Sequence, residues 1–361
     1  MLDSEYVYTG FHFSYSATVS EMKEDVDRLV ELIKEKNIEV IHVHPWFALY
    51  AAYFVAAKTN VKLVYTYHGT GSLNYNNNFG YQIIMEEIFT GAVSHVFCVG
   101  EQGVQALLSM GYDVNNASVL FNPIRPEEYP NTVPDMDRPH RGALVSRLDT
   151  DKLPAIEKLL KLLPDLEIDQ IDVYGNGDSL GHIQSIAEKT GKIVDFKGHT
   201  NEIGTVLSDN GYCGVIGLGR SAIEGLALGL PCLFIGYEKI VGLLDNTLYE
   251  MAKHQNFVPE NYRDLSTAEI NEQLTALYEN STNYILRDCV LEDFSISNIG
   301  DKYIRTIERA YAKCPSYAND IYKALIELCG VESTQLYNNK NIYNMMTSIF
   351  SAKPATLMLK K

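Results

Sequence analysis

The chain has little positive charge. Its 361 residues include 30 lysine and arginine residues against 46 aspartate and glutamate residues, which gives a formal net charge of −16 at pH 7. Nucleic acids and anionic membranes attract proteins through clusters of basic residues. The composition therefore excludes nucleic-acid binding as the main function and leaves room for peripheral membrane contact at most.

Long hydrophobic runs and cysteine pairs are also missing. No apolar run reaches the roughly 18 residues of a membrane-spanning helix, and no signal-peptide pattern is present. The six cysteines are scattered without a Cys-x-x-Cys pair, which is typical of reduced thiols in a reducing compartment. We therefore predict a cytoplasmic protein, with the inner face of the membrane as a second option.

What the chain does contain is a repeated alternation of strands and helices. At roughly 150 residues per domain, the length predicts two domains. Strand-like and helical patterns alternate before residue 122, stop in a proline-rich segment and then resume. We predict an α/β protein with domains at 1–122 and 141–294, a linker at 123–140 and C-terminal helices at 295–361.

The most informative stretch is VIGLGRSAIEGLALGLPCLFIGY, residues 215–237. It reads as strand, glycine turn, helix and strand, the βαβ pattern of a parallel sheet. Gly217 and Gly219 allow backbone N–H groups to approach an anion at the start of the helix. Glu224, on that helix, can accept hydrogen bonds from a ribose diol. The alternative is that the glycines only permit tight packing.

Other polar residues follow other predicted strands, where ligands of open α/β sheets bind. Arg147 and Lys152 share one strand-to-helix loop and can neutralise a diphosphate, or can be solvated charges beside Asp149 and Asp151. The turn at Gly175 and Asn176 follows another strand and is a weaker nucleotide signal.

Histidines end two predicted strands of the first domain. His68 can donate to a sugar hydroxyl or can be a structural histidine. His42 and His44 alternate on one strand, but no third ligand is close in sequence. We predict no metal site.

Taken together, the chain resembles a family 4 glycosyltransferase. The matching motifs run in the family's order: VIHVHPWFALYAAYFVAAKTNVKLVYTYHGT (40–70), SHVFCVGEQGVQALLSMG (94–111), VLFNPI (119–124), SRLDTDK (146–152), IDVYGNGD (171–178), VDFKGHTNEI (194–203) and GLGRSAIEGLALGLP (217–231). The resemblance implies the glycosyltransferase-B fold, in which two Rossmann-like domains face each other, and a nucleotide-sugar ligand.

The resemblance also implies roles for residues. Arg147 and Lys152 would hold the donor diphosphate, Glu224 the ribose and His68 the transferred sugar. Residues 217–221 would contact the phosphates and the sugar, which places Arg220 and Ser221 near the phosphates.

Two features depart from the family pattern. Family members carry two glutamates with seven residues between them; Glu224 matches the second, but Ile216 stands at the first. Family members also begin with strands that have no counterpart in this sequence, since Met1 falls just before the expected third strand. The N-terminal domain is therefore expected to be shortened. A sheet edge left open in this way invites pairing with a partner chain or a second copy.

Three functions remain from these observations. The first is a retaining glycosyltransferase that moves a sugar from a UDP- or GDP-linked donor to a glycan, lipid or protein acceptor, without metal or other cofactor. The second is a non-catalytic nucleotide-sugar-binding or partner subunit, favoured by Ile216 and the shortened domain. The third, an epimerase acting on a nucleotide sugar, ranks last because no pair of acid/base carboxylates is evident.

Overall fold

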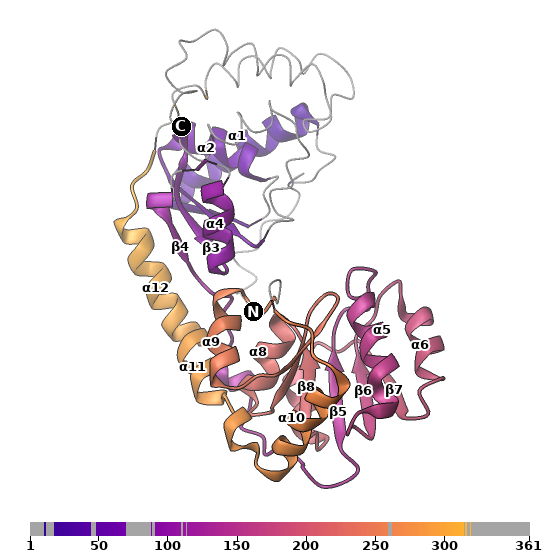
Figure 1. Ribbon diagram of the computed structural model, residues 1–361. Helices are drawn as coiled ribbons and strands as arrows, with labels where there is room; N and C mark the ends of the chain where they lie inside the picture. The colour runs from indigo at the N-terminus through magenta and orange to yellow at the C-terminus, as the bar shows by residue number, and fades with distance from the viewer. Residues whose placement is uncertain are drawn as a thin grey trace. The chain divides into compact units, whose positions relative to one another are not determined.

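The computed structural model describes residues 11, 18–44, 48–69, 88, 91–109, 111–112, 114–258, 262–313, 315 and 318. The chain forms two compact units, one made of Met1–Leu120 with Tyr303–Lys361 and one made of Phe121–Lys302 (Figure 1). The strand expected at 5–9, the loop at 74–78 and the helices at 81–90, 315–328 and 340–350 lie largely or wholly outside the described residues.

The first unit contains a four-stranded parallel sheet in the order β1-β2-β3-β4. Its elements are α1 (Val19–Lys36), β1 (Val40–Val43), α2 (Leu49–Thr59), β2 (Lys62–Tyr67), β3 (Val93–Cys98), α4 (Glu101–Ser109), the 3-10 turn η4 (Val114–Asn116) and β4 (Ala117–Val119). The helix α1 starts at a capping box, because the side chains of Thr18 and Glu21 each accept the other's backbone N–H.

Helices cover both faces of this sheet. Gly103 of α4 lies so close to Tyr67 and Cys98 that an added Cβ would come within 2.9 Å of each. Side chains on the opposite face belong to alternate positions of the strands. There, His42 and Phe97 contact Tyr303, whose ring centroid lies 5.3 Å and 5.2 Å from theirs.

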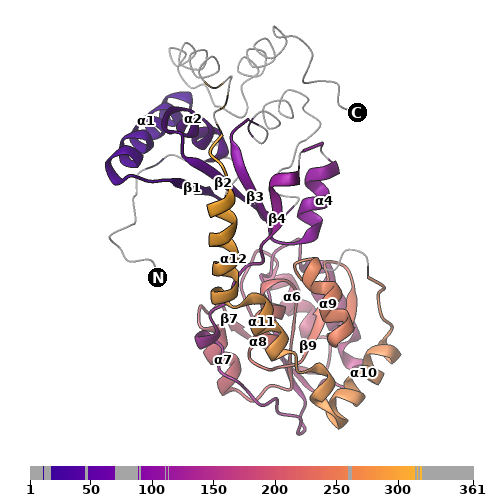
Figure 2. The same cartoon turned by 90° about the vertical axis from the view of Figure 1, so that its left-hand side faces the viewer.

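Tyr303 belongs to α12 (Ile296–Arg309), the helix along which the chain passes from the second unit back to the first. Figure 2 shows the C-terminal half of this helix beside the strands of the first sheet. The Lys62 ammonium donates to the Ile307 carbonyl at 2.9 Å, so the end of the helix is bonded to the start of β2.

The second unit contains a six-stranded sheet in the order β10-β9-β8-β5-β6-β7, parallel except for β10. Its elements are η5 (Pro126–Glu128), β5 (Arg141–Val145), α5 (Leu153–Leu162), η6 (Leu163–Asp165), β6 (Gln170–Tyr174), α6 (Leu180–Ala187), β7 (Ile193–Gly198), α7 (Ile203–Asp209), β8 (Gly214–Gly217), α8 (Arg220–Ala227), β9 (Cys232–Ile235), β10 (Ile240–Leu243), α9 (Asn246–His254), α10 (Thr267–Glu279), η7 (Ser281–Tyr284) and α11 (Arg287–Phe294).

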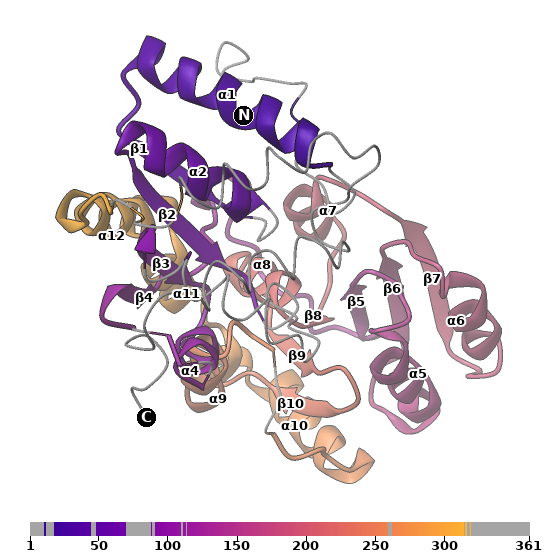
Figure 3. The same cartoon turned by 90° about the horizontal axis from the view of Figure 1, so that it is seen from above.

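Figure 3 shows α7 and α8 on one side of this row of strands and α5, α6 and α10 on the other. The predicted α/β class and its parallel sheets are confirmed. Two elements were not predicted, β10 and α11. The β10 strand is only four residues long and contains Gly242, and α11 is too polar to show a clear apolar repeat.

The predicted linker packs on the second unit. The Thr132 amide donates to the Leu228 carbonyl at 2.7 Å, and the Asp135 amide donates to the Tyr212 carbonyl at 3.0 Å. Ile124 forms a β-bridge with Ser295. Prolines interrupt any regular repeat, so the sequence resembles a linker. Several of its amides nevertheless have hydrogen-bond partners in the folded unit.

No helix among the described residues combines the length and the apolar character needed to cross a membrane.

Candidate functional site

In the second unit, loops that follow β5, β8 and β9 meet at one edge of the sheet. These strands are neighbours in the order β9-β8-β5 and run parallel, so their carboxyl ends lie together. The loop after β5 carries Arg147 and Lys152, the turn after β8 is Gly217–Gly219, and the loop after β9 carries Tyr237. The predicted diphosphate residues are therefore on adjacent loops.

Lys152 is largely buried at this edge, with 9% of the residue exposed. Its ammonium lies 3.6 Å from the centroid of the Tyr237 ring, in a cation–π contact. The strands β5 and β9 are separated by β8, which places them about 10 Å apart. The contact between Lys152 and Tyr237 therefore joins two loops that follow strands that are not neighbours in the sheet.

Arg147, on the same loop, is more exposed to solvent than Lys152. Its side chain is 67% exposed and forms ion pairs with Asp149 and, at 3.5 Å, with Asp151. Pairs between exposed groups contribute little to stability because water screens them. The guanidinium is thus held by carboxylates of its own loop, and a diphosphate would have to compete with them.

The turn at Gly175 and Asn176 supports this loop. Gly175 has a φ of +150°, and a Cβ there would lie 1.8 Å from the Ser146 carbonyl oxygen. The Leu148 amide donates to the Asn176 carbonyl at 3.0 Å. The glycine is needed for close packing of two backbones, and the turn shapes the loop that carries Arg147 and Lys152.

The glycine turn after β8 also uses several of its polar groups internally. Gly219 has a φ of +57°, and its amide donates to the Phe257 carbonyl at 2.7 Å. The Ser221 hydroxyl donates to the Leu218 carbonyl at 2.9 Å. At Gly217, a Cβ would lie 2.5 Å from the Ser221 hydroxyl. The groups left to face an anion are the first-turn amides of α8, which begin at Arg220.

Glu224 is the centre of a polar cluster on α8. Its Oε1 accepts from the Tyr129 hydroxyl at 2.9 Å and from Arg220 Nε at 2.7 Å. Arg220 also donates to the Pro123 carbonyl at 2.6 Å. Burial, and next the charge of Glu224, raise the pKa of Tyr129 to about 12. Among the described residues, Glu224 Oε2 has no partner, so it is the oxygen available to a ribose diol.

Sequence reasoning missed two of these residues, Tyr129 and Tyr237. Tyr129 lies in the segment predicted as a linker, and the sequence analysis assigned no role to Tyr237. The available signal was the position of Tyr237 after the apolar strand β9, between Gly236 and Glu238.

The first unit holds the predicted His68 in a chain of histidines. His44 Nδ1 and His68 Nε2 lie 3.0 Å apart and share a hydrogen bond. His42 lies beside His44, with 4.3 Å between the ring centroids, and bonds to the Thr66 and Tyr303 hydroxyls at 2.7 Å and 2.9 Å. The described residues contain no cluster of three or more potential metal ligands.

These histidines are neutral at pH 7. Burial, followed by the charges of His44 and His68, lowers the pKa of His42 to about 4. Partial burial also lowers the pKa of His44, and partial burial together with His44 lowers that of His68. Two neutral rings can share one proton as donor and acceptor, which is what the contact between His44 and His68 requires.

Comparison with known proteins gives a family match for part of the chain and a fold match for most of it. Residues 9–128 match the profile of the family described as Glycosyltransferase Family 4. Among solved structures, HepE (Alr3699) from Anabaena in complex with UDP is 14% identical and has a TM-score of 0.62, with 79% of this chain and 82% of HepE covered. The chain is thus similar to glycosyltransferase family 4 over residues 9–128 and has the fold of glycosyltransferase structures over most of its length.

Other solved structures share the fold of this chain. A sucrose-phosphate synthase from Thermosynechococcus elongatus is 13% identical over 81% of this chain and 78% of its own, with a TM-score of 0.60. A glycosyltransferase from Rickettsia africae is 15% identical over 89% and 85%, with a TM-score of 0.60. They show the glycosyltransferase-B fold. No curated protein matches the chain.

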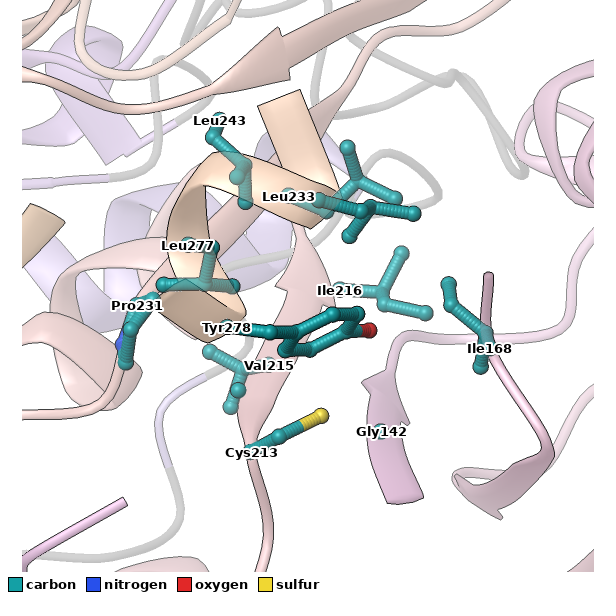
Figure 4. Close-up of a pocket in the computed structure, with 12 residues that line it drawn as sticks. Gly142, Ile168, Cys213, Val215, Ile216, Pro231, Leu233, Leu243, Leu277 and Tyr278 are labelled. Atoms are coloured by element: carbon teal, nitrogen blue, oxygen red, sulfur yellow. The ribbon is translucent and has the colours of Figure 1, made fainter. Parts of the chain in front are cut away.

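The family 4 pattern of two acids is incomplete in this chain, and the structure shows where the first position lies. Ile216 is 2% exposed and points from β8 toward α10, where it lines an apolar cavity of about 20 Å³ (Figure 4). Leu233, Leu277 and Tyr278 line the same cavity. The side chain at 216 is therefore on a packed face of the sheet and supplies no hydrogen bond to a ligand.

Proposed function

We propose that this chain is a retaining hexosyltransferase that uses a nucleotide diphosphate sugar. The observation that carries the proposal is the largely buried Lys152 ammonium, which lies against Tyr237 at the carboxyl edge of the sheet from which α8 also begins. A buried cation and a helix N-terminus on the same edge of a sheet are suited to a diphosphate. Glu224, on the same helix, is proposed to accept hydrogen bonds from a ribose diol.

The similarity to HepE suggests which donor to test first. The HepE structures contain UDP, UDP with glucose, or UDP-glucose. We take UDP-glucose as the first probe for this chain and a GDP-linked sugar as the second. The proposed acceptor is a hydroxyl group of a glycan, a lipid or a protein.

The proposed reaction breaks the bond between the sugar's anomeric carbon and the diphosphate oxygen. Lys152 and the first-turn amides of α8 stabilise the negative charge that grows on this oxygen. The acceptor hydroxyl attacks the anomeric carbon from the same face and passes its proton to the departing phosphate oxygen. No side-chain base is needed in this scheme, and retention follows from attack on the face that the diphosphate leaves.

The proposal includes independence from metal ions and other cofactors. Diphosphate charge is commonly neutralised by Mg²⁺, held by carboxylates. Here the candidate groups are Lys152 and, if it exchanges Asp149 and Asp151 for phosphate oxygens, Arg147. His68 is proposed to donate to a hydroxyl of the transferred sugar.

A second candidate function is a non-catalytic nucleotide-sugar-binding or partner subunit. Ile216 favours it, because the donor sugar would lack the contact that the family's first acid makes. A partner chain or a second copy could pair with β1, which is one of the two edge strands of its sheet among the described residues. For either function we propose a cytoplasmic location, at most peripheral to the inner face of the membrane.

Calorimetry with UDP and a product assay with UDP-glucose test the proposal together. We expect Lys152→Ala to weaken UDP binding by more than about 1.5 kcal/mol, since a charge-assisted contact is lost. Lys161→Ala is the matched control, because this lysine lies on α5, is 64% exposed and pairs with Glu157. Equal UDP affinity in wild type and Lys152→Ala would refute the site. Binding without sugar transfer or donor hydrolysis, with or without added partner proteins, would favour the non-catalytic function.

A further inference from the structure

Tyr237 is held at the donor edge of the second unit by a tight turn. The Gly236 amide donates to the Lys239 carbonyl at 2.7 Å, which closes the turn between β9 and the antiparallel β10. Tyr237 is the first residue inside this turn and is 38% exposed. Its ring has one face against the Lys152 ammonium and another part in contact with solvent.

The Lys152 ammonium has few other close contacts. The carboxylate of Asp151 lies 3.6 Å away, which is longer than a hydrogen bond, and is shared with Arg147 at 3.5 Å. No hydrogen bond from Lys152 Nζ to an acceptor is found within the described part of the chain. The ring of Tyr237 is therefore the principal group that sets the position of this cation.

We propose that Tyr237 is a positioning residue for diphosphate binding, acting through Lys152. The inference rests on the proposed function, in which Lys152 binds the donor diphosphate. Lysine has a flexible four-carbon chain and can swing by several ångströms. Without the ring, the ammonium can shorten its 3.6 Å ion pair with Asp151 to hydrogen-bond distance, and this tighter pair would compete with a phosphate.

An aromatic ring suits this task better than a carboxylate. A ring attracts the cation through its quadrupole and leaves the net charge of +1 in place. A carboxylate in the same position would hold the ammonium but cancel its charge toward an incoming diphosphate. Tyr237 thus holds the Lys152 ammonium at the carboxyl edge of the sheet while the N–H groups of the ammonium stay available.

The test compares Tyr237→Leu with Tyr237→Phe in the full chain. Leucine removes the ring and phenylalanine retains it. We expect Tyr237→Leu to weaken UDP binding by about three- to tenfold, as expected for the loss of a partly buried cation–π contact. Binding of UMP should be unchanged, because it lacks the β-phosphate. Tyr237→Phe should stay within about twofold of wild type.

A double variant tests whether the effect passes through Lys152. In a Lys152→Ala background, Tyr237→Leu should have no further effect on UDP affinity, because the two changes remove one interaction. Equal losses for UDP and UMP, an additive effect in the double variant, or tighter UDP binding by Tyr237→Leu would each overturn the inference.

A second readout does not depend on nucleotide binding. Reductive methylation followed by mass spectrometry measures how readily the Lys152 amine reacts. We expect faster modification of Lys152 in Tyr237→Leu than in wild type or Tyr237→Phe, and an unchanged rate at Lys161. If wild type fails to bind UDP but Lys152 shows this pattern, the proposed function is wrong while the contact stands. No change at Lys152 refutes the inference in either case.

Discussion

Replacing Glu224 by alanine should affect both the stability of the second unit and the binding of ribose. Glu224 is 14% exposed and accepts two hydrogen bonds, from Tyr129 at 2.9 Å and from Arg220 at 2.7 Å. Hydrogen bonds to a charged group contribute about 1.5 to 3 kcal/mol each. The Arg220 side chain is 46% exposed and can regain water, whereas Tyr129 is buried.

These contacts set the expected magnitude. We count the full loss for the buried Tyr129 hydroxyl and only part of the loss for Arg220. Glu224→Ala should then lower the free energy of opening around α8 by about 2 to 3 kcal/mol. Tyr129→Phe removes one hydrogen bond and keeps the carboxylate, so this variant should lower the same opening free energy by about 1 to 1.5 kcal/mol.

Hydrogen exchange measured on peptides from β8 and α8 is the suitable assay. The single tryptophan, at position 46, belongs to the first unit, so its fluorescence does not report on the second. Exchange also resolves local opening in a two-unit protein, for which one global unfolding free energy is poorly defined. A loss below about 0.5 kcal/mol in Glu224→Ala would refute the reasoning about the cluster.

Nucleotide binding tests the proposed contact of Glu224 with ribose separately from its role in stability. Its Oε2 is the oxygen we assign to the ribose diol. Glu224→Ala should therefore weaken UDP binding by about tenfold or more and leave 2′,3′-dideoxyuridine diphosphate unaffected. Tyr129→Phe, which retains Oε2, should preserve the preference for UDP over the dideoxy analogue. Equal weakening of both nucleotides by Glu224→Ala would show that the carboxylate acts only in the fold.

Two further predictions concern stability. Burial lowers the pKa values of His42 and His95 to about 4 in the folded chain. As pH falls below about 6.5, these histidines take up protons in the unfolded chain before they do so in the folded chain. The first unit should therefore lose stability between pH 6.5 and about 4, by at most about 3 kcal/mol for each histidine. Urea unfolding followed by tryptophan fluorescence should show this loss, with His42→Gln less sensitive to acid, and a midpoint that rises on acidification would contradict it. Gly225→Ala should destabilise the second unit by about 1 to 3 kcal/mol, because its Cβ would lie 2.0 Å from Val215 Cγ2. Gly181→Ala, on α6 with open space around it, is the matched control and should be neutral or stabilising by hydrogen exchange.

The periodicity of the sequence was sufficient for the class of the fold. Apolar runs such as residues 62–67 and 232–235 are short, continuous and separated by helical repeats, a pattern that parallel sheets impose because both faces are buried. Periodicity did not predict the strand β10, because an antiparallel edge strand after a tight turn lacks the spacing of a βαβ unit.

The candidate site was predicted in part. Lys152 and Glu224 were marked by their positions after strands or on the first turns of a helix. The sequence did not show that Gly175 supports the backbone of another loop, or that the Gly219 amide is already bonded to Phe257. These roles depend on contacts between segments far apart in the chain.

By itself, the sequence determined the alternating strands and helices, the two sheets and the resemblance to the family, because these follow from local periodicity and from motifs in a fixed order. Only the tertiary structure decided that Tyr237 covers the Lys152 ammonium and that Tyr129 and Arg220 share one oxygen of Glu224. The physical reason is that strand order, and not sequence order, brings the ends of β5, β8 and β9 together. Side-chain partners across those ends are set by packing, which no local pattern encodes.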